Sequence, residues 1–319
     1  MERPVTLKNN GQINIVLNNE TQKTHGTQTS SFIPVVKQEV KHEALRDIER
    51  EMGKLVGMDE MKRIVKEVYA WLYVSKRREE IGLKAEKQAL HMMFKGNPGT
   101  GKTTVARLLA KLFLEMKVLS KGHLIEAERA DLVGEYIGHT AQKTRDLIKK
   151  AMGGILFIDE AYSLGRGGEK DFGKEAIDTL VKHMEDRHQE FVLILAGYSR
   201  EMDNFLMLNP GLKSRFPLVI DFKDYTVSEL LQIADKMLKE RQYELTKEAL
   251  YKLRQHLNDV TGQSSLQAFS NGRYVRNVIE KSIRSQAMRL LSANKFDREE
   301  LMTLKSIDLI LADGEKVSF

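Results

Sequence analysis

The segment MMFKGNPGTGKT, residues 92–103, decides the fold of this 319-residue chain. It fills every fixed position of the pattern G-x-x-x-x-G-K-[ST], with Gly96, Gly101, Lys102 and Thr103. Glycines let the backbone curl so that its N–H groups face a phosphate chain, and a helix that starts there attracts anions with its dipole. An apolar strand precedes the loop and a helical pattern over residues 103–116 follows it. This context predicts a nucleotide site rather than an ordinary Gly/Pro turn.

The loop residues have distinct expected roles. Lys102 is placed to reach the β- and γ-phosphates, and the Thr103 hydroxyl to ligate Mg²⁺. The full set expected to bind ATP in the loop is Gly96, Asn97, Pro98, Gly99, Thr100, Gly101, Lys102, Thr103 and Thr104. The string NKFD at residues 294–297 matches the guanine-reading N-K-x-D of GTPases, but it follows a helical pattern instead of a buried strand. We therefore expect ATP rather than GTP.

Two carboxylates follow a fully apolar run. Residues 155–158 are Ile-Leu-Phe-Ile, and Asp159 and Glu160 come next. At the carboxyl end of a parallel strand these acids would face the same crevice as the phosphate loop. Asp159 is expected to hold Mg²⁺ and Glu160 to orient and deprotonate the attacking water. A pair of acids that only begins a solvated turn is the alternative, which the upstream phosphate loop disfavours.

Short apolar runs alternate with helical patterns through the middle of the chain. Residues 92–94, 124–127, 155–158, 191–196 and 218–222 predict strands, and residues 103–116, 140–151 and 172–184 predict helices. Such alternation is typical of a parallel sheet covered by helices on both faces. We therefore predict an α/β fold with a P-loop NTPase core.

The two ends of the chain differ from this core. Residues 1–42 are rich in Asn, Gln, Thr and Ser, so we expect a disordered or weakly ordered tail. A short adaptor-binding segment within this tail is an alternative that the sequence leaves open. Residues 42–84 have a helical pattern and belong to the core, residues 43–225. After Tyr225 the strand pattern stops; Thr226 and Glu229 predict a capping box, and residues 273–293 a long helix. Residues 226–319 are therefore expected to form a smaller helical domain.

Composition excludes several classes of protein. Hydrophobic residues make up 41% and charged residues 30% of the chain, an ordinary balance for a globular protein. The net charge of +6, from 51 basic and 45 acidic side chains, is modest, so nucleic acid is not an expected partner. The absence of cysteine excludes disulfides and thiolate metal sites. His183 and His188 fall on different helix faces, so no zinc site is expected. Without an N-terminal signal or an apolar run of roughly 20 residues, the expected location is the cytoplasm, away from membranes.

Beyond the phosphate loop, three longer strings carry a family resemblance. They are LVGEYIGHT at residues 132–140, AGY at residues 196–198 and NPGLKSRF at residues 209–216. From about Leu55 to Leu291 the chain resembles an AAA+ ATPase, more closely the family of red-type Rubisco activases and a sporulation protein of endospore-forming bacteria, with the sporulation branch favoured. The resemblance implies a helical AAA+ lid domain and a hexameric ring with ATP between neighbouring subunits.

The resemblance also implies roles for residues outside the phosphate loop. Arg215 would be the arginine finger that reaches the γ-phosphate in the next subunit, and Arg273 the sensor 2 arginine, with Arg276 as its competitor. With Glu160, Arg215 and Arg273 form the expected catalytic set. Val56 and Gly57 would contact adenine. Sensor 1 is left open, because the corresponding place reads Ala-Gly-Tyr-Ser at residues 196–199 and offers Tyr198 or Ser199.

Tyr136, Ile137 and Gly138 match the aromatic pore loop with which such rings grip a polypeptide. Tyr136 packed inside its own domain is the alternative. Gly165-Arg166-Gly167-Gly168 resembles a second loop facing the pore. The sequence thus favours an ATPase that remodels an unidentified protein client, Rubisco in one branch of the family or a sporulation protein in the other. The rival is an ATP-controlled binding or assembly module acting on DNA or a scaffold; a small-molecule kinase lacks a visible acceptor pocket.

Overall fold

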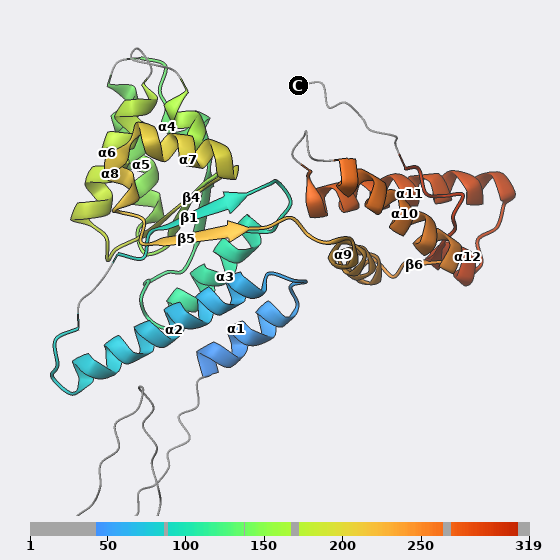
Figure 1. Cartoon of the computed structure of the whole chain (residues 1–319), viewed down its shortest axis with the longest axis horizontal. Coiled ribbons are helices and arrows are strands. Elements are labelled where there is room, and N and C mark those ends of the chain that lie inside the picture. Colours follow the sequence, from blue (N-terminus) through green and yellow to red (C-terminus); the bar gives the residue numbers. More distant parts are fainter. Residues whose placement is uncertain (1–42, 86–88, 137, 167–171, 264–268, 312–319) are drawn as a thin grey trace, which may run out of the picture. The chain divides into compact units, whose positions relative to one another are not determined.

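The computed structural model describes residues 43–85, 89–136, 138–166, 172–263 and 269–311. The predicted N-terminal tail, Ile137 and residues 167–168 of the second loop lie outside the described residues. Within the core, the helices and strands run in the order α1 (Glu43–Gly53), α2 (Asp59–Glu80), β1 (Met92–Gly96), α3 (Lys102–Glu115), β2 (Leu124–Ala127), α4 (Arg129–Leu132), α5 (His139–Ala151), β3 (Ile155–Ile158), a 3₁₀ turn η1 (Ala161–Gly165), α6 (Gly173–Asp186), β4 (Val192–Gly197), α7 (Ser199–Leu208), α8 (Pro210–Lys213) and β5 (Leu218–Phe222). Figure 1 labels most of these elements.

The five core strands form one parallel sheet in the order β2-β3-β4-β1-β5. Successive residues of β1 point to opposite faces: Met92 and Phe94 pack with α1, α2 and α3, whereas Met93 packs with α5, α6 and α7. In β3, Ile155 packs on the same face as Met92 and Phe94, and Leu156 packs on the same face as Met93. Both faces are therefore buried, which explains why these strands are uninterrupted apolar runs. The predicted parallel sheet with helices on both faces is confirmed, and all five strands lie where the apolar runs predicted them.

Residues 42–84, which were expected to be helical, form two helices separated by a sharp bend. Gly57 (φ 62°) and Met58 (φ 60°) both adopt the left-handed conformation between α1 and α2. A residue with positive φ cannot continue a right-handed helix, so the chain turns there. The bend brings residues 54–58 toward the phosphate loop, as described below.

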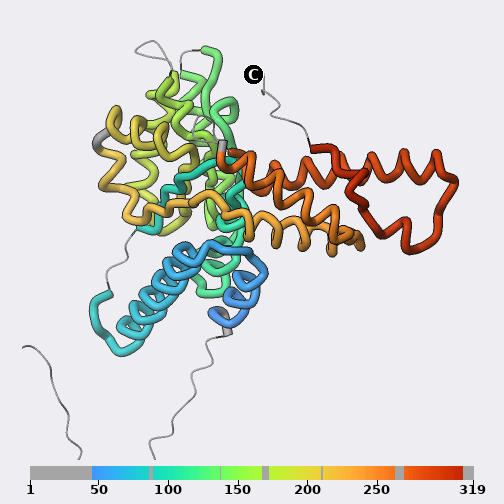
Figure 2. Tube along the Cα trace, turned by 45° about the vertical axis from the view of Figure 1, so that its right-hand side comes forward, coloured from blue at the N-terminus to red at the C-terminus, as the bar shows by residue number. Residues whose placement is uncertain are grey.

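The residues after the core form a helical lid. Its elements are α9 (Val227–Glu240), β6 (Glu244–Leu245), α10 (Lys247–Gln263), α11 (Asn271–Ala293), α12 (Arg298–Met302) and β7 (Thr303–Leu304). In α9 the predicted capping box is present, since Thr226 Oγ1 accepts from the Glu229 N–H and the Glu229 carboxylate accepts from the Thr226 N–H. The lid helices α9, α10 and α11 pack around their own apolar core (Figure 2). The two-residue parallel strands β6 and β7 are too short to leave a periodic pattern, and the sequence did not predict them.

Candidate nucleotide-binding site

The phosphate loop connects β1, in the interior of the sheet, to α3. Gly99 (φ 69°) and Gly101 (φ 94°) take the left-handed conformation that side chains disfavour. A Cβ on Gly99 would lie 2.2 Å from the carbonyl oxygen of Ser270, so this backbone packs directly against the start of α11. Glycine is therefore required for space as well as for conformation.

Lys102 lies at the first turn of α3 with its ammonium group beside the loop. Its Nζ donates to the carbonyl oxygens of Gly96 and Asn97, at 2.8 Å each. Burial lowers the pKa of Lys102, whereas the carboxylate of Asp159 opposes that shift. The side chain is thus a partly desolvated cation at the mouth of the loop, the position from which it would contact phosphate oxygens.

Asp159 and Glu160 directly follow β3. Oδ1 of Asp159 accepts the N–H of Glu160 at 2.9 Å. Glu160 itself has φ 47° and ψ 40°, a left-handed conformation that is uncommon outside glycine and often found where function demands it. This conformation starts the η1 turn immediately after the strand and leaves both carboxylates exposed.

Tyr198 follows β4, the strand between β1 and β3, so it stands between the phosphate loop and the carboxylates. Burial raises the pKa of Tyr198, and the nearby Glu160 carboxylate raises it further. The ring of Tyr162 lies 5.9 Å from that of Tyr198, centroid to centroid. Tyr198 therefore contributes a protonated hydroxyl to the same cleft as Glu160.

These parts surround one cleft of about 870 Å³. The phosphate loop, Asp159, Glu160, Tyr198 and the start of α11 all contribute to its lining. Thr103 and Asp159 offer a hydroxyl and a carboxylate, the hard oxygen ligands that Mg²⁺ prefers. The chemistry of these side chains fits a nucleoside triphosphate with its magnesium ion.

Comparison with known proteins agrees with this geometry. Residues 92–224 match the ATPase family associated with various cellular activities (AAA), and residues 226–318 match the AAA lid domain. Stage V sporulation protein K of Bacillus subtilis is 66% identical over 315 residues, 98% of either chain. The chain belongs to the AAA ATPase family. It binds nucleotide and hydrolyses ATP, and the resemblance predicted from the sequence is confirmed.

Other relatives of this AAA ATPase include Rubisco activase. The chloroplastic activase of Cyanidioschyzon merolae is 42% identical over 89% of this chain and 96% of its own length. Protein CbbX of Cereibacter sphaeroides is 43% identical over 84% of this chain and 85% of its own. Among solved structures, the FIGL-1 AAA domain in complex with ADP has a TM-score of 0.56 at 16% identity, covering 85% of this chain and 89% of that one, which supports the fold alone.

Most of the residues expected to bind ATP line the cleft of this AAA ATPase, but three do not. Gly57 is part of the bend before α2, the Asn97 side chain turns to Asp224, and Thr100 is 1% exposed with its hydroxyl donating to the Asn97 carbonyl at 2.8 Å. Both Arg273 and its competitor Arg276 line the cleft. Of these two arginines, only Arg273 affects the pKa of Lys102. Its positive charge lowers that pKa, and this effect is smaller than those of burial and of Asp159.

Arg215 and the expected pore loop lie elsewhere. Among the described residues that line the cleft, Arg215 is absent; its guanidinium contacts Glu185 instead. Tyr136 is 65% exposed, and its ring meets that of His139 edge-on with centroids 5.4 Å apart. The alternative, in which Tyr136 packs inside its own domain, is therefore not what the structure contains.

The sequence did not identify a large part of the cleft lining. The missed residues come mainly from the bend before α2, from the start of the lid and from α9: Lys54, Leu55, Met58, Arg107, Glu126, Gly197, Tyr225, Ile233, Lys236, Met237, Glu240, Arg241 and Gly272. Ile233 and Met237 follow helical spacing on α9, so their pattern signalled only an apolar helix face. Nothing local distinguishes a helix face that covers a core from one that covers a ligand.

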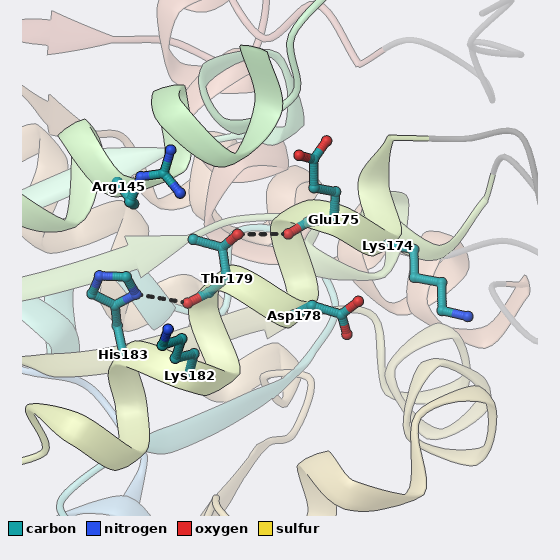
Figure 3. A pocket seen from close by; sticks show the side chains of 7 residues that line it. All are labelled: Arg145, Lys174, Glu175, Asp178, Thr179, Lys182 and His183. Atoms are coloured by element: carbon teal, nitrogen blue, oxygen red, sulfur yellow. Dashed lines mark hydrogen bonds between the residues drawn. The ribbon is translucent and has the colours of Figure 1, made fainter. Parts of the chain in front are cut away.

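A separate surface groove lies between α5 and α6 (Figure 3), lined by Arg145, Lys174, Glu175, Asp178, Thr179, Lys182 and His183. The groove contains both acidic and basic side chains. Two of its polar side chains form hydrogen bonds within α6: the Thr179 hydroxyl donates to the Glu175 carbonyl at 2.8 Å, and Nδ1 of His183 lies 2.9 Å from the Thr179 carbonyl oxygen. No group of three or more His, Cys, Asp or Glu side chains that could hold a metal ion by itself occurs in the described part of the chain. Likewise, none of the described helices is both long and apolar enough to cross a membrane.

Proposed function

We propose that this ATPase is a protein-remodelling motor that assembles into a hexameric ring, hydrolyses ATP at subunit interfaces and pulls on a protein client. Sporulation is the process suggested by its similarity to stage V sporulation protein K. The observation that carries the proposal is the position of Arg215. Arg215 does not line the cleft of its own chain, and its side chain is half-buried at the surface, where it can act on the nucleotide of a neighbouring subunit.

The charged and hydroxyl groups at the phosphate loop and after β3 have distinct roles in the proposed hydrolysis. Lys102 and the loop N–H groups bind the β- and γ-phosphates, and Thr103 and Asp159 hold Mg²⁺, which would neutralise phosphate charge. Glu160 accepts a proton from the attacking water as the water oxygen bonds to the γ-phosphorus and ADP departs. Arg273 from the lid and Arg215 from the neighbour stabilise the charge on the transferred phosphoryl group.

Tyr136 is proposed to grip the client. Its ring is exposed beside Gly134 and Gly138, on a segment between α4 and α5. An exposed aromatic ring can press against an extended chain without sequence-specific hydrogen bonds. Replacing Tyr136 with Ala should preserve basal ATP turnover and remove any stimulation of turnover by an unfolded model polypeptide. Stimulation that persists in this variant would remove Tyr136 from the proposal.

The test of shared sites is ATP turnover against protein concentration, for the native chain and for Arg215→Ala. Specific activity should rise cooperatively in the native chain and stay near zero in the variant. Arg187→Ala, which removes a surface arginine paired with Glu190 at 3.7 Å, is the matched control and should behave like the native chain. Turnover that is independent of concentration and survives Arg215→Ala would mean that each chain is a complete ATPase.

A mixing experiment sharpens the same test. Arg215→Ala and Glu160→Gln chains should each be inactive alone. Mixed, they should regain activity, because an intact Glu160 in one chain meets an intact Arg215 from the other. If mixing restores nothing while both chains still co-assemble, Arg215 does not act across an interface.

The rival function, an assembly module on DNA, would instead be favoured by duplex DNA binding with a steep salt dependence.

A further inference from the structure

Four consecutive residues of the phosphate loop, 97–100, are hydrogen-bonded to two segments, residues 224–225 just before the lid and residues 271–272 at the start of α11. The Asn97 side-chain amide donates to both carboxylate oxygens of Asp224, at 3.0 and 2.9 Å. The Asn271 amide lies 3.4 Å from the Pro98 carbonyl oxygen. Asp224 precedes α9, where the chain enters the lid, and Asn271 begins α11 within the lid, so the loop is fastened both at the entry to the lid and to the first turn of one of its helices.

Two further bonds continue the series along the loop. The Gly272 N–H donates to the Gly99 carbonyl at 3.1 Å, and the Tyr225 hydroxyl donates to the Thr100 carbonyl at 3.2 Å. Each bond uses a loop carbonyl or side chain and leaves the loop N–H groups available for phosphate. The loop therefore cannot change shape without disturbing the attachment of the lid.

Asn271 stands at the centre of this arrangement. Its side-chain oxygen accepts the Tyr225 N–H at 2.9 Å, and its amide donates to Asp224 Oδ1 at 2.7 Å and to the Phe269 carbonyl at 3.0 Å. The residue is fully buried, and its φ of 47° is left-handed. Asparagine tolerates this conformation better than most residues, and a buried amide with several partners keeps it in one orientation. The bonds to Asp224 are charge-assisted, which makes them stronger than those between neutral groups.

We propose that Asn271 and Asp224 are positioning residues that clasp the phosphate loop to the lid, so that the loop and the lid change conformation together when nucleotide binds. Neither residue needs to touch the nucleotide. The inference depends only on nucleotide binding by the loop, so it stands or falls separately from the proposed ring and from protein remodelling.

The test uses Asn271→Gly in the full chain, because glycine accepts the left-handed backbone and removes only the side-chain amide. Asn294→Gly is the matched control: Asn294 has φ 49°, is exposed and ends the same helix far along the chain. Affinity for a fluorescent ATP analogue should fall about tenfold to a hundredfold in Asn271→Gly, as expected for lost hydrogen bonds to a charged group, and stay native in Asn294→Gly.

A second measurement separates coupling from a purely structural role. At saturating ADP, amide hydrogen exchange should slow in α9 and α11 of the native chain and of Asn294→Gly, but not in Asn271→Gly. Asp224→Asn, at an exposed side chain, should give the same two results if Asn271→Gly fails to fold, with Asp221→Asn as its control. Native affinity together with native lid protection in a folded Asn271→Gly or Asp224→Asn chain would overturn the clasp.

Discussion

Nε of Arg215 lies 2.9 Å from Oε1 of Glu185, a residue 30 positions earlier near the end of α6. The same guanidinium also contacts the carbonyl oxygen of Gly211, so its donors are directed at its own chain. A carboxylate that pairs with a guanidinium competes with any phosphate for the same donors. In the proposed ring, Arg215 must exchange this partner for the γ-phosphate of a neighbour.

Replacing Glu185 with Gln should therefore release Arg215 and lower the protein concentration at which ATP turnover reaches half of its maximum. The side chains of the pair are 28% and 55% exposed, and such pairs contribute at most about 1 kcal/mol, so the shift should not exceed about fivefold. Glu190→Gln, which breaks the exposed pair with Arg187, is the control and should cause no shift. A fall in maximal turnover in Glu185→Gln would show instead that Glu185 orients the finger.

Replacing Glu160 with Gln should separate binding from hydrolysis. The amide cannot accept a proton from water, so phosphate release should slow by about 10²- to 10⁴-fold while ATP affinity changes little. Lys102→Ala should have the opposite profile and lose ATP affinity directly, because it removes the cation beside the loop. Equal loss of ATP affinity in the two variants, measured with a fluorescent analogue, would contradict the assigned division of roles.

His91 should make the stability of the core sensitive to mild acid. It is 1% exposed, its Nδ1 accepts the Leu193 N–H at 3.0 Å, and its other nitrogen lies 3.3 Å from the Met184 carbonyl oxygen. Burial lowers the pKa of His91 to about 4, against about 6.5 in an unfolded chain. The unfolded state therefore takes up a proton at higher pH than the folded state, and stability is lost as the pH falls from 6.5 towards 4. Between pH 7 and 5 the free energy of unfolding should drop by about 2 kcal/mol from this group.

Urea unfolding at both pH values measures this drop. His91→Asn retains an acceptor for the Leu193 N–H but does not titrate, so its stability should change less between pH 7 and 5. His139→Asn, at an exposed histidine, should keep the native pH dependence. An unchanged pH dependence in His91→Asn would mean that other groups cause the effect.

Arg289 should be the most sensitive charged residue of the lid. Its guanidinium binds both oxygens of Asp308, at 2.7 and 3.0 Å, and Glu300 at 2.8 Å, and the Asp308 side chain is only 1% exposed. Arg289→Met would leave a buried carboxylate without its counter-ion, which costs about 3–5 kcal/mol.

The matched control for Arg289 is Arg241→Met. Arg241 pairs with Glu280 at 3.4 Å, and both side chains are more than 40% exposed, so the loss should stay below about 1 kcal/mol. Urea unfolding followed by far-UV circular dichroism compares the two variants. Similar midpoints for Arg289→Met and the native chain would rule out a stabilising role for the Arg289–Asp308 pair.

Much of the site could be predicted because its chemistry is contiguous in the chain. Gly96 to Thr104 and the Asp159–Glu160 pair occur in short strings whose spacing fixes their geometry, and the parallel sheet brings both strings to one edge. The remaining lining of the cleft could not be predicted in this way. Met58 and Tyr225, for example, belong to segments that no local pattern connects with the phosphate loop. Tyr198 was offered as a sensor 1 candidate by the resemblance, but its place between the two strings depends on the strand order, in which β4 separates β1 from β3.

Local sequence is enough to specify the elements whose causes lie within a few residues. The capping box of Thr226 and Glu229, the apolar strands and the glycine loop depend on hydrogen bonds and side-chain periodicity between near neighbours. The contacts between distant groups, such as Asn271 with Asp224, 47 positions apart, and Arg215 with Glu185, depend on the tertiary structure. The physical reason is that these contacts form when packed apolar faces bring separate helices and strands together, and side chains then bond to whatever partner that packing places within reach.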